Sequence, residues 1–367
     1  MRIINVCGAR PNFMKIAPLM RAFSSRPGIE ARLIHTGQHY DDAMNKAFFD
    51  DLKIPRPDVN LEVGSASHAV QTAQIMERFE PVLERERPDA VLVVGDVNST
   101  IACGLVAVKR RVPLMHVEAG LRSGDRSMPE EINRVLTDAI SDLLFVTEPS
   151  GVVNLKREGV GEEKIHLVGN VMIDTLRSHQ EMAAMSPVLE RLGLSPGGYG
   201  ALTLHRPANV DDPAVFAGIC EALAEIQQTL PLVFPVHPRT RANLKGNGLL
   251  ARLKAMEGLR LIPPLGYLDF LKLMSSAAVV LTDSGGIQEE TTVLGVPCLT
   301  LRENTERPVT IEQGTNQLVG MDPAEILAGF RRVQGGEIEH RVPALWDGRA
   351  AERIADVVER WHGERGG

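Results

Sequence analysis

The chain has 367 residues, 44% of them hydrophobic and 24% charged, so it can build two cores of ordinary domain size and is not a disordered polypeptide. A formal net charge of −7 argues against a surface that binds nucleic acid or an anionic membrane. The four cysteines lie singly in apolar stretches with no CxxC pair, which predicts buried free thiols in a reducing compartment.

Short apolar runs alternate with amphipathic stretches along almost the whole chain. The first series of runs predicts strands at 2–6, 32–35, 90–94, 114–117, 143–146 and 165–168. The second series predicts strands at 201–204, 232–236, 259–262, 279–281 and 297–301. Apolar strands separated by helices are typical of parallel sheets covered on both faces, so we expect an α/β fold with two doubly wound sheets.

A segment rich in proline, glycine and serine, 178–200, separates the two series. We expect a Rossmann-like domain at 1–173, a second at 174–349, and a last helix at 350–367 that packs back on the first domain. The chain opens on a strand rather than a basic and apolar leader, and no apolar run approaches the roughly 20 residues of a membrane span. These features predict a cytoplasmic protein without membrane contact.

Polar residues follow the predicted strands at their carboxyl ends in both series. The groups are GARP at 8–11, TGQH at 36–39, GD at 95–96, EAG at 118–120, HR at 205–206, HPR at 237–239, DSGG at 283–286 and Arg302. Open parallel sheets bind ligands beyond the carboxyl ends of their strands. Two such edges predict two domains facing a central cleft and a ligand long enough to reach both.

The turn Ser284-Gly285-Gly286 precedes a predicted helix, whose N–H groups and positive end suit a phosphate. The same residues also fit a plain tight turn with a serine N-cap. Glu289 and Glu290 can stabilise the start of this helix, but neighbouring helical residues point about 100° apart, so one of them can face a ligand. A carboxylate beside a phosphate site suits the hydroxyls of ribose, which predicts a nucleoside diphosphate.

Arg10 and Lys15 place two cations after the first predicted strand. Arg10 can clamp a diphosphate with two donors, or can be a solvated loop arginine. Neither GxGxxG nor GxxxxGK[ST] occurs in the chain, so nicotinamide and P-loop chemistry are disfavoured and no cofactor is expected.

Acidic residues are the sharpest feature of the first half. Asp96 and Glu118 each end an apolar strand, where a carboxylate is costly unless it is paired, solvated or used in chemistry. Glu130 and Glu131 open a predicted helix, where acids favour the dipole and Glu131 can pair with Arg134. Grouped carboxylates on one edge also suit a general acid and a general base.

His205 and His237 end strands of the second half and could be read as zinc ligands, but no third ligand stands at a helpful spacing, so no metal is expected. Contact with a phosphate or leaving group fits them better. The GxSxG elbow of a serine nucleophile is also missing.

The chain resembles the non-hydrolysing UDP-N-acetylglucosamine 2-epimerases in motifs spread over nearly its whole length. They are GARPNFMK, HTGQHYD, VVGDVNST, HVEAGLRS, MPEEINR, LHRPANV, DSGGIQEE and NTERP. The resemblance implies a GT-B fold, a cytoplasmic homodimer and no redox cofactor. It also implies reversible epimerisation at C2 of UDP-N-acetylglucosamine to UDP-N-acetylmannosamine, through loss of UDP to give 2-acetamidoglucal and its re-addition.

Roles for individual residues follow from the same resemblance. It implies catalytic roles for Asp96, Glu118, Glu130 and His205, with His205 at the leaving diphosphate. It implies substrate contacts for Arg10, Lys15, Phe270, Ser284, Gly285, Gly286, Glu290 and Arg307. Among these, Ser284–Gly286 match the diphosphate turn, Glu290 the ribose ligand and Phe270 the neighbour of the base.

The sequence departs from the family pattern at two places. Ala208 stands where many members carry an acid, and Asp41 follows Gln38 where some bacterial members use glutamines to bind a second, activating UDP-N-acetylglucosamine. Other readings stay open as well: a 2-epimerase of a diacetamido uronate, a GT-B glycosyltransferase that uses a UDP-sugar, a hydrolysing epimerase, or a non-enzymatic UDP-sugar sensor.

Overall fold

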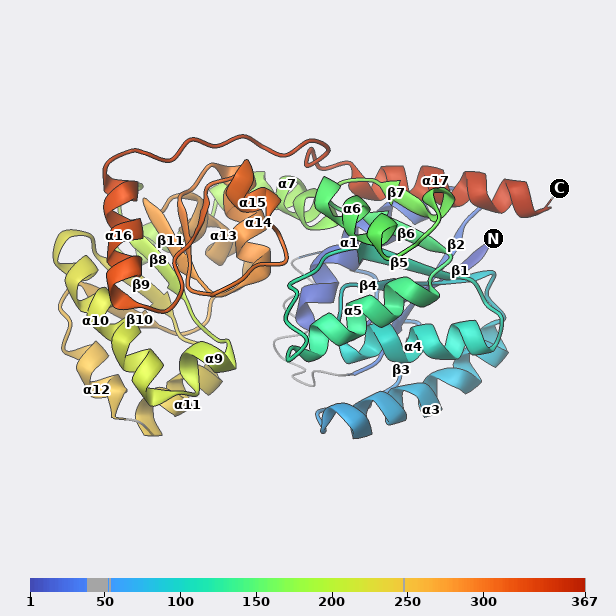
Figure 1. Cartoon of the computed structure of the whole chain (residues 1–367), viewed down its shortest axis with the longest axis horizontal. Helices are drawn as coiled ribbons and strands as arrows, with labels where there is room; N and C mark the ends of the chain where they lie inside the picture. The colour runs from blue at the N-terminus through green and yellow to red at the C-terminus, as the bar shows by residue number, and fades with distance from the viewer. Residues whose placement is uncertain (38–51, 53, 247, 367) are drawn as a thin grey trace. The chain divides into compact units, whose positions relative to one another are not determined.

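The computed structural model describes residues 1–37, 52, 54–246 and 248–366. The chain divides into two compact units. Unit 1 consists of Met1–Ser178 and Ala344–Gly367, and unit 2 of His179–Pro343 (Figure 1). Each helix in the described part of the chain is too short or too polar to cross a membrane.

Unit 1 is built on a parallel sheet with seven described strands in the order β3-β2-β1-β4-β5-β6-β7. Its strands are β1 (Arg2–Cys7), β2 (Glu30–His35), β3 (Val59–Asn60), β4 (Ala90–Val94), β5 (Leu114–Ala119), β6 (Leu143–Val146) and β7 (Ile165–Leu167). Every residue of β4, β5 and β6 is buried. These apolar runs therefore lie in the centre of the sheet, covered on both faces.

The helices of unit 1 cover both faces of this sheet. The described helices are α1 (Arg10–Ser24), α3 (His68–Glu86), α4 (Asn98–Lys109), α5 (Pro129–Ile140), α6 (Pro149–Arg157) and α17 (Ala350–Gly366), with a 3₁₀ turn at Glu162–Lys164. Helix α7 (Val171–Ala184) begins in unit 1 and ends in unit 2. Helices α3, α4 and α5 pack side by side, while α1 packs against α17 (Figure 1). The last helix begins at a cap in unit 1, because Asp174 accepts hydrogen bonds from the N–H groups of Ala350 and Ala351 at 3.0 and 2.7 Å.

Unit 2 repeats the design with six described parallel strands in the order β10-β9-β8-β11-β12-β13. The strands are β8 (Gly200–Thr203), β9 (Leu232–Pro235), β10 (Leu259–Ile262), β11 (Val279–Thr282), β12 (Cys298–Thr300) and β13 (Asn316–Leu318). Its helices are α8 (Val188–Arg191), α9 (Pro207–Val210), α10 (Pro213–Thr229), α11 (Pro238–Gly246), α12 (Leu249–Lys254), α13 (Tyr267–Ser275), α14 (Gly285–Leu294), α15 (Val309–Glu312) and α16 (Pro323–Gln334).

Both sheets reverse their strand order at one place, between β1 and β4 in unit 1 and between β8 and β11 in unit 2. Ligands of open parallel sheets bind outside the carboxyl ends of the strands at this reversal. Asp96 follows β4, and Asp283 follows β11. The predicted α/β class with two parallel sheets is confirmed, and Asp96, His205 and Ser284 follow strands that flank the switch points.

Candidate active site

Glu118, the carboxylate that ends β5, is buried and held in an unusual backbone conformation. Its φ is +71°, and the pairing of β5 with β6 shifts register between Val117 and Ala119. A left-handed conformation in a residue other than glycine costs about 1–3 kcal/mol and is concentrated at functional sites. The Glu118 side chain forms an ion pair with Lys15 of α1, and the two side chains are only 3% and 9% exposed.

Gly95, which ends β4, lies directly against this ion pair. Its φ is +67°, and a Cβ placed on it would lie 3.1 Å from Glu118 Oε2 and 3.2 Å from Lys15 Nζ. The absence of a side chain therefore lets the end of β4 approach the Glu118–Lys15 pair closely. Lys15, which the resemblance assigned to the substrate, has Glu118 as its partner in this structure.

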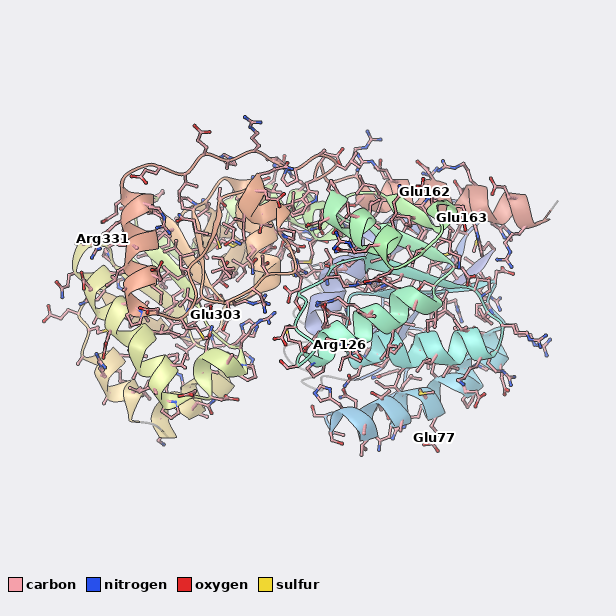
Figure 2. All side chains as sticks on the ribbon, in the orientation of Figure 1. Glu77, Arg126, Glu162, Glu163, Glu303 and Arg331 are labelled. Atoms are coloured by element: carbon pink, nitrogen blue, oxygen red, sulfur yellow. The ribbon has the colours of Figure 1, made fainter. Side chains whose placement is uncertain are left out.

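Asp96, the next residue, is anchored to α5 but keeps access to solvent. Its carboxylate pairs with Arg134 and is 31% exposed, and its backbone carbonyl accepts a hydrogen bond from Asn133 at 2.9 Å. Other acids of unit 1, such as Glu77, Glu162 and Glu163, project from the surface (Figure 2). Asp96 and Glu118 differ from these exposed acids in being partly or fully buried against their ion-pair partners.

Glu130 and Glu131, neighbours in the first turn of α5, have different environments. Glu131 is buried and accepts hydrogen bonds from the N–H groups of Ser123 and Gly124 at 3.0 and 2.9 Å and from Arg134. Burial pushes the pKa of Glu131 upward, but these donors hold it below its usual value. Glu130 is partly exposed, and no described residue pairs with it. Glu131 therefore holds the preceding loop and also makes the expected pair with Arg134. Glu130 is available to a ligand.

In unit 2, His205 rests against a buried carboxylate at the end of β11. Its ring Nδ1 lies 2.9 Å from Asp283 Oδ1, and Asp283 also accepts hydrogen bonds from the N–H groups of His205 and Arg206 and from Asn209. Burial pushes the pKa of Asp283 upward, but His205 and these donors hold it below its usual value. The His205 side chain is 52% exposed, so Asp283 orients a ring whose other edge can reach a ligand.

The glycine turn opens α14 as expected. Ser284 occupies the N-cap position, but within the described residues its side chain makes no capping hydrogen bond. Ser284, Gly285 and Gly286 are all partly exposed, which leaves the first N–H groups of α14 accessible. A Cβ on Gly285 would lie 2.7 Å from Arg307 Nη1, so the guanidinium lies over this turn.

Arg307 is oriented by two buried carboxylates. Its Nε donates to Glu289 Oε1 at 2.5 Å, and its Nη1 lies 3.4 Å from Glu306 Oε2. Glu306 also accepts two hydrogen bonds from Arg302, at 2.8 and 3.0 Å. Burial acts to raise the pKa of Glu306, but the arginines around it hold that pKa far below its usual value. Glu289 thus binds Arg307, so its negative charge is compensated although it lies close to a turn that suits an anion.

Glu290, the second of these acids, is buried and accepts a hydrogen bond from Tyr267 Oη at 3.2 Å. The pKa of Glu290 is raised to about 8, because burial and the charge of Glu289 raise it by more than the hydrogen bond from Tyr267 lowers it. Phe270 is partly buried on α13, one turn after Tyr267. The sequence did not reveal Tyr267, since the pairing joins residues of two different helices.

The raised pKa of Glu290 predicts a pH dependence of folding. From about pH 4.5 to about 8 only the folded chain keeps this proton, so the stability it contributes is full at acid pH and is lost as pH rises through that window. Glu290→Gln removes the titrating group. Its stability relative to wild type should therefore increase, by roughly a few kcal/mol, between pH 4.5 and 8 in urea unfolding. Parallel curves for the two proteins over this range would contradict the prediction.

Three residues singled out from the sequence lie wholly or partly outside the described part of the structure. Arg10 begins α1, but its side chain lies outside the described part of the structure, and so do Gln38 and Asp41. His237 is exposed after β9. Among the described residues, no cluster of three or more histidine, cysteine, aspartate or glutamate side chains is arranged to hold a metal ion.

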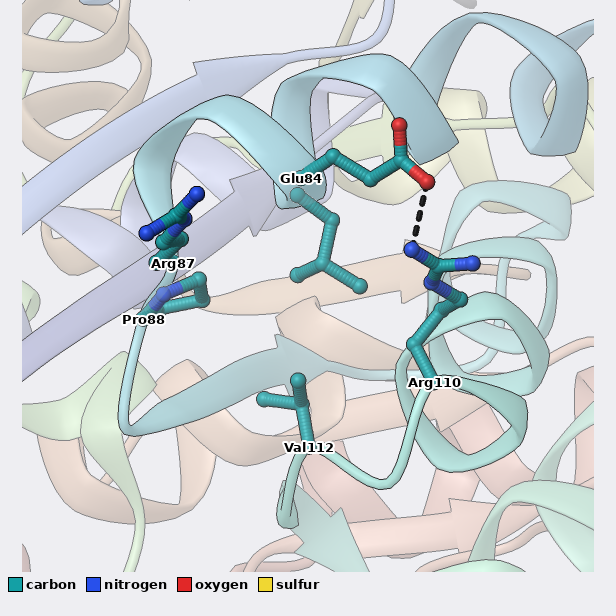
Figure 3. Close-up of a pocket in the computed structure, with 6 residues that line it drawn as sticks. Glu84, Arg87, Pro88, Arg110 and Val112 are labelled. Carbon is teal, nitrogen blue, oxygen red and sulfur yellow. Dashed lines mark hydrogen bonds and ion pairs between the residues drawn. The ribbon is translucent and has the colours of Figure 1, made fainter.

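A pocket of about 500 Å³ lies in unit 1 at the amino ends of strands β4 and β5 (Figure 3). Its lining residues end α3 and α4 or lead into β4 and β5: Leu83, Glu84, Arg87, Pro88, Arg110 and Val112. The ion pair between Arg110 and Glu84 stands at its side. Because it opens at the amino ends of the strands, this pocket is separate from the edge that carries Asp96 and Glu118.

Comparison with known proteins gives matches over nearly the full length. Residues 21–359 match the family model described as UDP-N-acetylglucosamine 2-epimerase. The chain is 41% identical to "UDP-N-acetylglucosamine 2-epimerase" of Methanocaldococcus jannaschii, over 98% of this chain and 99% of that protein. It is 40% identical to "UDP-2,3-diacetamido-2,3-dideoxy-D-glucuronate 2-epimerase" of Pseudomonas aeruginosa, over 98% and 100%. The crystal structure of the M. jannaschii enzyme in complex with UDP-GlcNAc and UDP superimposes with a TM-score of 0.92, covering 98% of this chain and 100% of that one.

Proposed function

The chain belongs to the UDP-N-acetylglucosamine 2-epimerase family, and we propose that it is an isomerase that interconverts UDP-N-acetylglucosamine and UDP-N-acetylmannosamine. The observation that carries this proposal is the likeness, over 98% of the chain, to a relative that bears the name of this activity. The solved structure of that relative contains UDP-GlcNAc and UDP, which supports a sugar nucleotide as the substrate class.

The residues of unit 2 would hold the UDP moiety. The accessible N–H groups of α14, the Arg307 guanidinium and the exposed ring of His205 suit a diphosphate. Glu290, supported by Tyr267, would bind the ribose hydroxyls, and Phe270 would lie near the uracil. Arg10 of unit 1 is kept as a proposed diphosphate contact because of its motif.

The residues of unit 1 would act on the sugar. The C2 hydrogen of UDP-N-acetylglucosamine has no adjacent carbonyl, so simple deprotonation would leave an unsupported carbanion. If a carboxylate takes this proton while the C1–O bond breaks, the C–H electron pair forms the C1=C2 double bond of 2-acetamidoglucal and UDP leaves with the C1–O pair. Re-addition of UDP at C1, with a proton delivered to the opposite face of C2, gives the epimer.

Asp96, Glu118 and Glu130 are the proposed proton carriers. Proton transfer by positioned acids typically contributes about 10²–10⁴-fold, so stabilisation of the departing diphosphate must supply much of the remaining acceleration. His205, Arg307 and the N-terminus of α14 are the groups of unit 2 that can do this. The proposal thus assigns charge stabilisation to one unit and proton transfer to the other.

Incubation with UDP-N-acetylglucosamine alone tests the function. We expect proton NMR to show UDP-N-acetylmannosamine accumulating until both epimers are at equilibrium. Release of free N-acetylmannosamine and UDP would instead identify a hydrolysing epimerase. An unchanged substrate that turns over only after a sugar acceptor is added would identify a glycosyltransferase.

A second substrate has a specific observation in its favour. The relative named as an epimerase of UDP-2,3-diacetamido-2,3-dideoxy-D-glucuronate is 40% identical, almost the value of the N-acetylglucosamine epimerase. Values of kcat/KM measured with both sugar nucleotides decide between them.

We also propose that the protein is a cytoplasmic homodimer. Ile132 and Leu136 lie one turn apart on α5 with 42% and 49% of their surface exposed, and they supply apolar surface for contact between two copies.

A further inference from the structure

We propose that His116 and Asp138 are positioning residues, a buried pair that clamps the ends of β4 and β5 so that Asp96 and Glu118 keep the geometry that proton transfer needs. This inference rests on the proposed epimerase function. Neither residue belongs to the set of site residues named from the sequence.

His116 joins the two strand ends directly. It lies on β5, fully buried, with Nδ1 2.6 Å from Asp138 Oδ1 and Nε2 2.8 Å from the carbonyl oxygen of Gly95. One neighbour is the Asp138 carboxylate and the other a backbone carbonyl, so the ring bridges the end of β4 to α5.

Asp138 completes the clamp from α5. Its Oδ2 accepts hydrogen bonds from the N–H of Gly120 at 3.0 Å and from Arg122 Nη1 at 2.7 Å. Arg122 in turn binds Glu158 through two hydrogen bonds, at 2.6 and 2.8 Å. A single buried carboxylate thus holds the end of β5 from one side and, through His116, the end of β4 from the other.

The strand ends need such a clamp because their backbone is irregular. Gly95, Glu118 and Gly120 all have positive φ, at +67°, +71° and +80°, and the ladder between β5 and β6 shifts register at this point. The regular sheet therefore does not fix the Gly95 carbonyl or the Gly120 N–H, and His116 and Asp138 supply partners for them. Because a misplacement of about 1 Å can cost about 10²-fold in rate, loss of these partners should affect catalysis.

The same helix carries the groups that hold Asp96. Asn133 donates to the Asp96 carbonyl, Arg134 pairs with the Asp96 carboxylate, and Glu130 opens the helix. Asp138 lies one turn beyond Arg134 and fixes α5 to both strands. Helix α5 therefore fixes the positions of the three proposed proton carriers relative to one another: it contains Glu130, binds Asp96, and holds the backbone beside Glu118 through Asp138.

Two substitutions at His116 separate the arms of the clamp. The amide of His116→Asn can take the place of Nδ1 and keep the bond to Asp138, whereas that of His116→Gln can take the place of Nε2 and keep the bond to Gly95. Asp138→Asn removes the charge that both arms share. The matched control is Asn5→Val, because Asn5 is a fully buried residue of β1 whose Nδ2 donates to the carbonyls of Ile3 and Arg32 away from the strand ends.

The readouts are kcat, KM and UDP affinity, the melting temperature, and amide hydrogen exchange of peptides that span 94–97 and 117–121. We expect the His116 and Asp138 variants to lose at least about tenfold in kcat, to keep UDP affinity within about twofold, and to exchange faster in both peptides. Asn5→Val removes two hydrogen bonds, of 3.4 and 3.3 Å, and should leave kcat within about twofold whatever its change in melting temperature.

A purely structural role would give a different result. Folded His116 and Asp138 variants with wild-type kcat, or a kcat loss that follows the melting temperature equally in Asn5→Val, would overturn the proposal. Hydrogen exchange does not depend on turnover, so a clamp that loosens in a chain with no epimerase activity would count against the proposed function and not against the clamp.

Discussion

Asp96→Asn should lower kcat about 10²–10⁴-fold, the range expected for loss of a general acid or base, and leave UDP affinity nearly unchanged. Asparagine keeps the shape of the side chain but not its basicity. Arg134, the partner of Asp96, still has Glu131 as a second partner in the variant, so α5 should stay in place. The proposed UDP contacts, those in unit 2 and Arg10 of unit 1, keep their side chains in this variant.

Turnover measured by NMR and UDP binding measured by calorimetry separate these effects. Glu77→Gln is a suitable control, because Glu77 is an exposed acid on α3 and its neutralisation should change neither quantity (Figure 2). Near-wild-type turnover of a folded Asp96→Asn protein would remove Asp96 from the proton-transfer step. A loss of UDP affinity equal to the loss of kcat would assign it to binding instead.

Lys15→Met should destabilise unit 1 by up to about 3–5 kcal/mol and abolish activity, since it takes the Lys15 cation away from the buried Glu118 carboxylate. Adding Glu118→Gln removes that carboxylate charge, so the double variant should regain most of the lost stability. It should remain inactive if Glu118 takes part in proton transfer. Urea unfolding and turnover of the two single variants and the double variant give the complete cycle.

A surface ion pair provides the matched control for this cycle. Arg349 and Glu352 lie 2.9 Å apart with side chains 69% and 57% exposed, and Arg349→Met should change the stability little because solvent screens the pair. A cost for Lys15→Met no larger than that of Arg349→Met would show that burial of the Lys15–Glu118 pair has little energetic consequence. Full activity in the double variant would exclude Glu118 from the chemistry.

Most of the fold could be predicted because its central strands are continuous apolar runs. The runs at 90–94, 143–146 and 259–262 coincide with β4, β6 and β10, and the other eight predicted strands differ from the observed bounds by a few residues. The strands β3 and β13 were not predicted. Each has only two or three residues and includes asparagine, and each lies at the edge of its sheet, where pairing rather than apolar composition defines it.

The site could be predicted only in part, because sequence shows which residues end strands but not what they contact. Asp96 and Glu118 follow apolar runs and were recognisable for that reason. The pairing of Lys15 with Glu118 joins residues 103 positions apart, and it exists only because α1 covers the strand that neighbours β4. The only sequence signal of His116 was that it is a polar residue inside an apolar strand. Nothing in the sequence indicated that Asp138 is buried on α5.

The wild-type reaction with UDP-N-acetylglucosamine in D₂O tests most directly whether a carboxylate of unit 1 removes the C2 proton. The proposed mechanism predicts that deuterium enters C2 of both epimers as they interconvert, because the returning proton comes from a carboxyl group that has exchanged with solvent. Epimers that interconvert while both keep protium at C2 would contradict it.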